Sequence, residues 1–193
     1  MVLDKPGKLS YESPSSFRLI VLLRTVSKIL ERIIAARLLH TACSRGLFHH
    51  NPSGSLPGRS TYDACLTLMN DVKALQKPRL KLFFLFLDIK GGFDNGDNPT
   101  LARILREGGI PHYLLSWVAS FLGERSCRLV FPGTPGTPAS VNVVVRQGSP
   151  ISLLLFLIYV SPLHCRIPRR LIVSYVDDFA LTTASLSYRG NLH

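Results

Sequence analysis

The chain has 193 residues and a formal net charge of +11, from 23 Lys and Arg against 12 Asp and Glu. Hydrophobic residues make up 46% and charged residues 18%, so the chain can bury a core and is not a disordered polypeptide. The basic excess favours a polyanionic partner, either nucleic acid or an anionic membrane surface. A membrane-spanning helix is not expected, because Pro150 and Pro162 interrupt the longest uncharged stretch, residues 147–165.

The cysteines are widely spaced and form no CxxC pair. They are Cys43, Cys65, Cys127 and Cys165. With no apolar leader at the N-terminus, this pattern favours free, mostly buried thiols in a reducing intracellular compartment. A zinc site at Cys43 and the histidine pair at 49–50 is not expected, since a second ligand pair at metal-binding spacing is missing.

The first part of the chain is predicted to be mainly helical. Residues 1–16 are expected to be an irregular lead-in or a hairpin. A helix is predicted over about 24–43, because apolar residues recur there at helical spacing. These residues are Val26, Ile29, Leu30, Ile33, Ile34 and Leu38. Residues 46–60 are rich in proline and glycine and predict a loop, after which Ser60 and Asp63 predict a capped helix with Leu68, Val72 and Leu75 on one face.

Strands and helices alternate in the middle of the chain. The wholly apolar run Leu82–Leu87 predicts a buried strand. Asn98 as N-cap, with Pro99 after it, predicts a helix that ends at Gly108–Gly109. Pro111 is expected to begin another helix, which ends near Gly123.

The last part of the chain is predicted to contain two hairpins around a buried helix. Apolar residues alternate over 127–131 and again over 141–145, which predicts the first hairpin. Residues 151–163 predict the helix, and Leu171–Val176 with Phe179–Thr183 predict the second hairpin. The interspersed elements indicate an α+β fold.

Three of the acidic residues fall at predicted strand ends. Asp88 follows the apolar strand, while Asp177 and Asp178 lie at the turn of the second hairpin. If they converge, their repulsion favours a divalent cation, and Mg²⁺ is the hard cation that carboxylates and phosphates share. Two such ions can activate a hydroxyl and stabilise the leaving oxygen of a phosphoryl transfer. An Asp pair is also common in ordinary turns, so the pair alone does not decide the function.

Ordered motifs surround these carboxylates. Tyr175–Asp178 (YVDD) is similar to the YxDD box of reverse transcriptases, and Leu87–Asp94 (LDIKGGFD) resembles their first palm motif. Gln147–Ser152 (QGSPIS) resembles the motif between the two. Further blocks at 17–38, 57–64 and 109–125 resemble the non-LTR (LINE-like) retrotransposon branch. The chain thus resembles reverse transcriptases of this family over about residues 5–189.

The resemblance implies the fingers and palm of a right-hand polymerase, with an antiparallel sheet packed on helices. About residues 1–80 would be the fingers-like part, and about 81–193 a palm that is truncated at its C-terminus, with the thumb missing. The implied activity is that of an RNA-directed DNA polymerase, which adds deoxynucleotides to a DNA 3′ end. Its partners would be an RNA template, a DNA primer and dNTPs, without a membrane; the oligomeric state stays open.

The resemblance also implies a role for individual residues. Asp88 and Asp177 would ligate two Mg²⁺ ions, for which Mn²⁺ can substitute, with Asp178 beside them and the carbonyl of Ile89 in the metal shell. The residues implied at the incoming nucleotide are Arg18 as a phosphate clamp, the backbone NH groups of Lys90 and Gly91, Phe93 as a gate against the ribose 2′-OH, Gln147 against the nucleotide and Gly148 close to the template.

Alternatives remain open at this point. Gly92, Gly96 and Leu153 depart from the family pattern, and with the missing thumb they allow a catalytically inactive relic that retains weak nucleic-acid binding. A group II intron maturase shares the YxDD palm, and a viral RNA polymerase would more often carry Gly-Asp-Asp. Nuclear residence is expected from the family's habit, or mitochondrial residence for a maturase.

Overall fold

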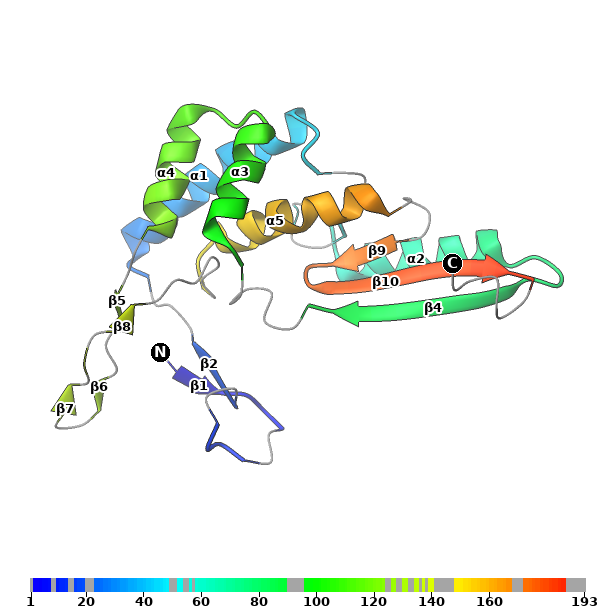
Figure 1. Ribbon diagram of the computed structural model, residues 1–193, viewed down its shortest axis with the longest axis horizontal. Helices are drawn as coiled ribbons and strands as arrows, with labels where there is room; N and C mark the ends of the chain where they lie inside the picture. The colour runs from blue at the N-terminus through cyan, green and yellow to red at the C-terminus, as the bar shows by residue number, and fades with distance from the viewer. Residues whose placement is uncertain are drawn as a thin grey trace.

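The computed structural model describes residues 2–7, 10–13, 16–19, 23–48, 52–53, 56, 58–89, 96–123, 126–127, 130–131, 134–135, 137, 139–140, 148–167 and 172–186. These residues form five helices and a main sheet with three longer antiparallel strands (Figure 1). The α+β fold predicted from the sequence is confirmed. No helix in this part of the chain is long and apolar enough to cross a bilayer.

The main sheet is built from a hairpin and one distant strand. β9 (Ile172–Tyr175) and β10 (Asp178–Ser185) are joined by a two-residue turn, and β4 (Lys81–Asp88) pairs antiparallel with the whole of β10. β3 (Pro52–Ser53) adds a short parallel pairing to β9, so the strand order is β3-β9-β10-β4.

Four helices share one apolar core. They are α1 (Thr25–Ser44), α3 (Asn98–Glu107), α4 (His112–Leu122) and α5 (Ser152–Arg166). Their largest fully buried side chains include Leu38, Leu101, Leu114 and Phe156. α5 is buried along most of its length, as the sequence predicted.

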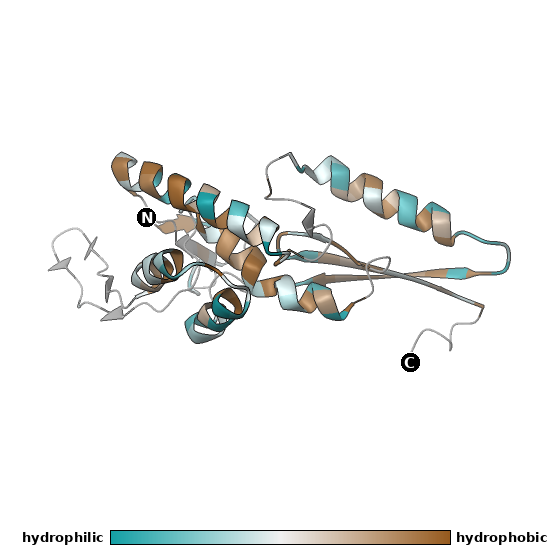
Figure 2. Cartoon of the chain, turned by 90° about the horizontal axis from the view of Figure 1, so that it is seen from above, coloured by the Kyte–Doolittle hydropathy of each residue, from teal (hydrophilic) through white to brown (hydrophobic). Residues whose placement is uncertain are grey.

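The main sheet lies between two helices. α2 (Thr61–Leu75) contacts β9 and β10 on one face. On the other face, His164 of α5 hydrogen-bonds the Ser174 hydroxyl at 2.8 Å, and its ring lies 5.3 Å from that of Phe179. Figure 2 shows α2 and α5 on opposite sides of the strands. The end of the hairpin is therefore held from both faces.

Short strands pair elsewhere in the chain. β1 (Val2–Asp4) pairs with β2 (Phe17–Leu19), β5 (Ser126–Cys127) with β8 (Ala139–Ser140), and β6 (Val130–Phe131) with β7 (Thr134–Pro135). The first pair is an N-terminal hairpin whose second strand lies just beyond residues 1–16, where an irregular lead-in or a hairpin was expected. The alternating residues predicted over 141–145 lie outside the described residues.

Helix ends follow the sequence signals closely. At α2, the Ser60 hydroxyl accepts from the Asp63 backbone NH at 3.3 Å, and Asp63 accepts from the Ser60 NH at 2.7 Å, which is the predicted capping box. At α3, the cap is Asp97 rather than Asn98: Asp97 accepts from the Thr100 NH at 2.8 Å. The sequence prediction was one residue too late, because either residue type can cap a helix before a proline.

Burial differs from the sequence prediction in three places. β4 was predicted to be a buried strand, but it is an edge strand that exposes Phe84 to Leu87 by between 45% and 68%. Uniform apolarity did not mean burial here, because no described element covers the outer edge of β4. The cysteines predicted as mostly buried are exposed at Cys43, Cys65 and Cys165.

The third difference concerns α1. Only Ile34 and Leu38 of its predicted apolar face are buried, together with Glu31 and Ala42. The others, Val26, Ile29, Leu30 and Ile33, are exposed. The helix presents more apolar surface than one neighbouring layer can cover. Helical periodicity therefore predicted burial for residues near its N-terminus that are exposed.

Candidate active site

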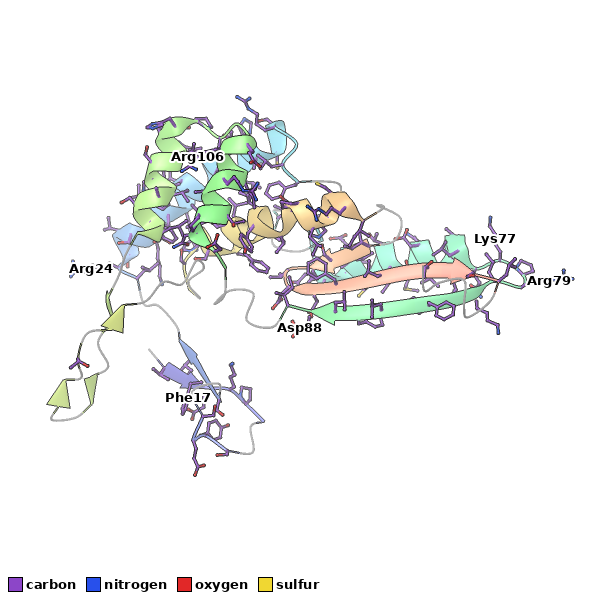
Figure 3. All side chains as sticks on the ribbon, viewed as in Figure 1. Phe17, Arg24, Lys77, Arg79, Asp88 and Arg106 are labelled. Atoms are coloured by element: carbon purple, nitrogen blue, oxygen red, sulfur yellow. The ribbon has the colours of Figure 1, made fainter. Side chains whose placement is uncertain are left out.

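The register of the sheet brings together carboxylates from two distant segments. Asp88 is the last residue of β4 and Asp178 the first of β10, and the two are direct partners in the antiparallel pairing. Direct partners point to the same face of a sheet, with Cβ atoms about 5 Å apart. Figure 3 labels Asp88 at the end of β4, beside the β9–β10 turn. The predicted proximity of positions 88 and 178 is thus present in the backbone.

Asp177 joins this pair through the turn. It forms the β9–β10 turn with Val176, and its carbonyl accepts a hydrogen bond of 3.3 Å from the backbone NH of Ile89. The sequence predicts Asp177 and Asp178 together at the turn, whereas in the structure Asp178 is the first residue of β10. This shift of one residue is what sets Asp178 opposite Asp88.

The turn has an unusual backbone at Val176. Its φ is +60°, a region that a β-branched residue rarely adopts and that glycine normally occupies at the first position of such a hairpin turn. Val176 and Ile89 both pack against the apolar core of the helical layer. This packing fixes the backbone on either side of the carboxylates in spite of the local strain.

The electrostatics of the three carboxylates are linked. Burial raises the pKa of Asp177 above its usual range, and repulsion from Asp178 and Asp88 raises the pKa further, while a backbone hydrogen bond lowers it. Asp177 is half-buried, and Asp88 and Asp178 are exposed. Three carboxylates that repel one another thus lie at this end of the sheet, in a chain whose net charge is strongly positive.

A cavity of about 390 Å³ opens beside the carboxylates. Its walls are the α2 residues Ala64, Cys65 and Leu68, the β4 residues Phe86 to Asp88, and parts of β9 and β10 that include Tyr175 and Asp178. The lining is mostly apolar, and Asp88 and Asp178 contribute the carboxylates to it. An apolar cavity with a few polar groups is a common form of ligand site.

The side chains themselves do not converge on one point. Across the described residues, no three His, Cys, Asp or Glu side chains are arranged closely enough to hold a metal ion. The donor type nevertheless suits Mg²⁺, which prefers carboxylate oxygens. The fit to a hard cation thus holds for backbone placement and donor chemistry, and the exposed Asp88 and Asp178 side chains would have to turn toward the ion.

Gly148 is the other predicted site residue that the structure describes in full. It has φ +104° in the turn before α5, a conformation that favours glycine. Lys90, Gly91, Phe93 and Gln147 lie outside the described residues. Arg18 lies in β2, with its backbone described and its side chain outside that description.

The sequence predicted no role for Glu31, whose side chain contacts this turn. Glu31 is buried in α1 and accepts a hydrogen bond from the Ser149 hydroxyl. A signal was available, because Glu31 is the sole acidic residue of α1 and lies at helical spacing from Ile34 and Leu38.

Comparison with known proteins identifies the family of the chain. A family model described as "Reverse transcriptase (RNA-dependent DNA polymerase)" matches residues 3–191. A "Probable RNA-directed DNA polymerase from transposon BS" of Drosophila melanogaster is 28% identical over 96% of this chain and 21% of its own length.

Further relatives have similar names. A "Probable RNA-directed DNA polymerase from transposon X-element" of Drosophila melanogaster is 26% identical over 95% of this chain and 20% of its own length. A "Retrovirus-related Pol polyprotein from type-1 retrotransposable element R2" of Popillia japonica is 26% identical over 85% of this chain and 22% of its own length. The chain spans about a fifth of the length of these curated relatives. It belongs to the reverse transcriptase family, as its motifs of the non-LTR, LINE-like branch predict.

Proposed function

We propose that this chain carries the polymerising site of a retrotransposon reverse transcriptase, which adds deoxynucleotides to the 3′ end of a DNA primer on an RNA template. The observation that supports this most is the pairing of Asp88 with Asp178, with Asp177 held beside them by the Ile89 hydrogen bond. This pairing joins two residues that lie 90 positions apart in the sequence, as a shared metal site requires.

In this proposal Asp88, Asp177 and Asp178 would hold two Mg²⁺ ions, with the Ile89 carbonyl as a further ligand. Bound there, the ions would supply activation of the primer 3′-hydroxyl and stabilisation of the leaving oxygen. The raised pKa of Asp177 supports the proposal, because uncompensated carboxylates favour a cation. The Val176 turn and the core behind it fix the backbone next to the carboxylates, whose side chains would turn toward the ions.

The remaining residues are assigned from the family pattern. Gln147 would contact the incoming dNTP, with Gly148 against the template and Phe93 excluding a ribose 2′-OH. Arg18, Lys90 and Gly91 would bind the triphosphate. About residues 1–80 would form the fingers-like part and about 81–193 the palm. The net charge of +11 suits a template and primer whose phosphates supply most of the binding energy.

A primer-extension assay tests the function. The chain is incubated with Mg²⁺, dTTP and oligo(dT) annealed to poly(rA), beside Asp177→Asn and the matched control Asp4→Asn, which changes an exposed carboxylate in β1. The proposal predicts extension by the chain and by Asp4→Asn, with Asp177→Asn lower by about a thousandfold, since several kcal/mol of charge stabilisation are lost. Equal extension by all three proteins, or none by the unsubstituted chain, would contradict it; the latter result would favour the inactive relic.

A further inference from the structure

One hydrogen bond joins α1 to the turn before α5. The Ser149 hydroxyl donates to Oε2 of Glu31 at 2.5 Å, across 118 positions of sequence. Glu31 is 5% exposed and Ser149 is 8% exposed. The contact is therefore a buried tertiary link and not a surface contact between mobile side chains.

Burial of the Glu31 carboxyl group destabilises the folded chain unless a partner satisfies it. It shares the buried face of α1 with Ile34, Leu38 and Ala42, where an apolar side chain would fill the same space without losing hydration. A buried carboxyl is tolerated when a partner satisfies it, and removing that partner leaves a desolvated polar group. Stability alone would favour an apolar residue here, which points to a second requirement at this position.

The Ser149 turn is what the link restrains. Gly148 is in the left-handed region, with φ +104°. The Ser149 carbonyl accepts from the Ser152 NH at 3.3 Å, and so begins α5. Ser149 does not cap the helix with its side chain, since its hydroxyl is directed to Glu31. Glu31 thus fixes the direction in which the chain enters α5.

This turn and the carboxylates share one core. Ile151, two residues after Ser149, is fully buried in the cluster against which Ile89 and Val176 pack. These two residues are the sequence neighbours of Asp88 and Asp177. A displacement of the turn would therefore also displace Ile89 and Val176, because packed interiors transmit small displacements.

We propose that Glu31 is a positioning residue for the incoming dNTP: through Ser149 it holds the turn at Gly148, which shares its apolar core with the residues next to Asp88 and Asp177. This inference rests on the proposed function. Glu31 does not touch the substrate, so its loss should weaken nucleotide binding more than it slows the chemical step.

The test measures KM for dTTP and kcat in primer extension. Glu31→Ala and Ser149→Ala should each raise KM about tenfold, as expected for loss of a hydrogen bond to a carboxyl group, with kcat within about threefold. The double variant should be no worse than either single variant, because both changes remove the same link. Glu31→Gln retains an acceptor of the same shape and should stay within about threefold of the unsubstituted chain. The control Glu107→Gln changes an exposed carboxylate on α3 and should leave both constants unchanged.

A second measurement separates this inference from the proposed function. A fluorescent dTTP analogue is titrated into the chain bound to a primer with a terminated 3′ end, so that binding is read without catalysis. Weaker binding by Glu31→Ala, restored by Glu31→Gln, supports the positioning role even if extension fails. The role is overturned if Glu31→Ala only lowers the melting temperature while KM and analogue affinity stay unchanged, if the two single changes are additive, or if the unsubstituted chain binds no analogue.

Discussion

Asp88 and Asp178 are direct partners across the antiparallel pair of β4 and β10, at the end of the sheet where the β9–β10 turn carries Asp177. The pairing register fixes this relationship, and a slip of one residue would send one of the two side chains to the opposite face. The hydrogen bond from the Ile89 NH to the Asp177 carbonyl holds the same register at its last position. The backbone thus gathers three negative charges before any ligand binds.

Replacing Asp177 with Asn should stabilise the metal-free protein at neutral pH. Burial, with repulsion from Asp178 and Asp88, raises the pKa of Asp177 in the folded state, so its ionised form costs stability at pH 7. The cost disappears as the pH falls through the raised pKa, and is gone below the ordinary value of 3.8. Urea unfolding in a chelating buffer should therefore show Asp177→Asn more stable at pH 7 and equal to the unsubstituted chain near pH 3.5. A gap that stays constant over this range would contradict the assignment.

Magnesium should reverse this order of stability. An ion bound by the three carboxylates stabilises only the folded chain, by about 1.4 kcal/mol when its concentration is ten times the Kd. The melting temperature of the unsubstituted chain should rise with Mg²⁺ at pH 7, while that of Asp177→Asn stays nearly constant. KCl at matched ionic strength serves as the control for general screening. Equal shifts in both proteins would mean that Mg²⁺ binds elsewhere.

The start of α2 should depend on its capping box. Ser60→Ala removes the hydroxyl that accepts from the Asp63 NH, and should lower the free energy of unfolding by about 1 kcal/mol. Hydrogen bonds from the Ser60 side chain and backbone lower the pKa of Asp63, and Arg59 lowers it further. That contribution is present above the ordinary pKa of Asp63 and is lost as the pH falls through the lowered one. Urea unfolding at pH 7 and pH 2.5 should thus show a smaller effect of Ser60→Ala in acid.

The edge of the sheet should promote self-association. β4 exposes four consecutive large apolar residues, and the rings of Phe84 and Phe86 stack with centroids 6.3 Å apart. Phe86→Lys places a charge at the residue that is 68% exposed, which is how natural edge strands avoid pairing. Sedimentation velocity should show less association, while the free energy of unfolding changes by about 1 kcal/mol or less. Unchanged association at equal concentration would show that β4 is not the surface responsible.

The site could be predicted from the sequence because each carboxylate lies beside a strong secondary-structure signal. The apolar run before Asp88 and the turn residues at 177 and 178 located two strand ends, and the order of motifs then indicated that these ends meet. Register could not be read from either segment alone, since it depends on how β10 pairs with β4 across the sheet. In the register that the structure shows, Asp178 is the first residue of β10 and not a turn residue.

Burial was the part that local patterns could not decide. The apolar residues of β4 and of the first two turns of α1 predict covered surfaces, yet no described element lies over them. An apolar surface favours burial, but it is buried only where a neighbouring element covers it. Glu31 is the opposite case: a charged residue is buried. Its burial is explained by the hydrogen bond from Ser149, which the sequence of α1 alone does not predict.

The most direct test of the shared carboxylate site uses Mn²⁺ as a paramagnetic substitute for Mg²⁺. At substoichiometric Mn²⁺, the account predicts that the backbone amide signals of Ile89 and Asp178 broaden together, and that Asp177→Asn removes both effects. The control Asp4→Asn should leave the broadening intact. Broadening of one amide without the other, or broadening that survives in Asp177→Asn, would contradict a single site built from the ends of β4 and β10.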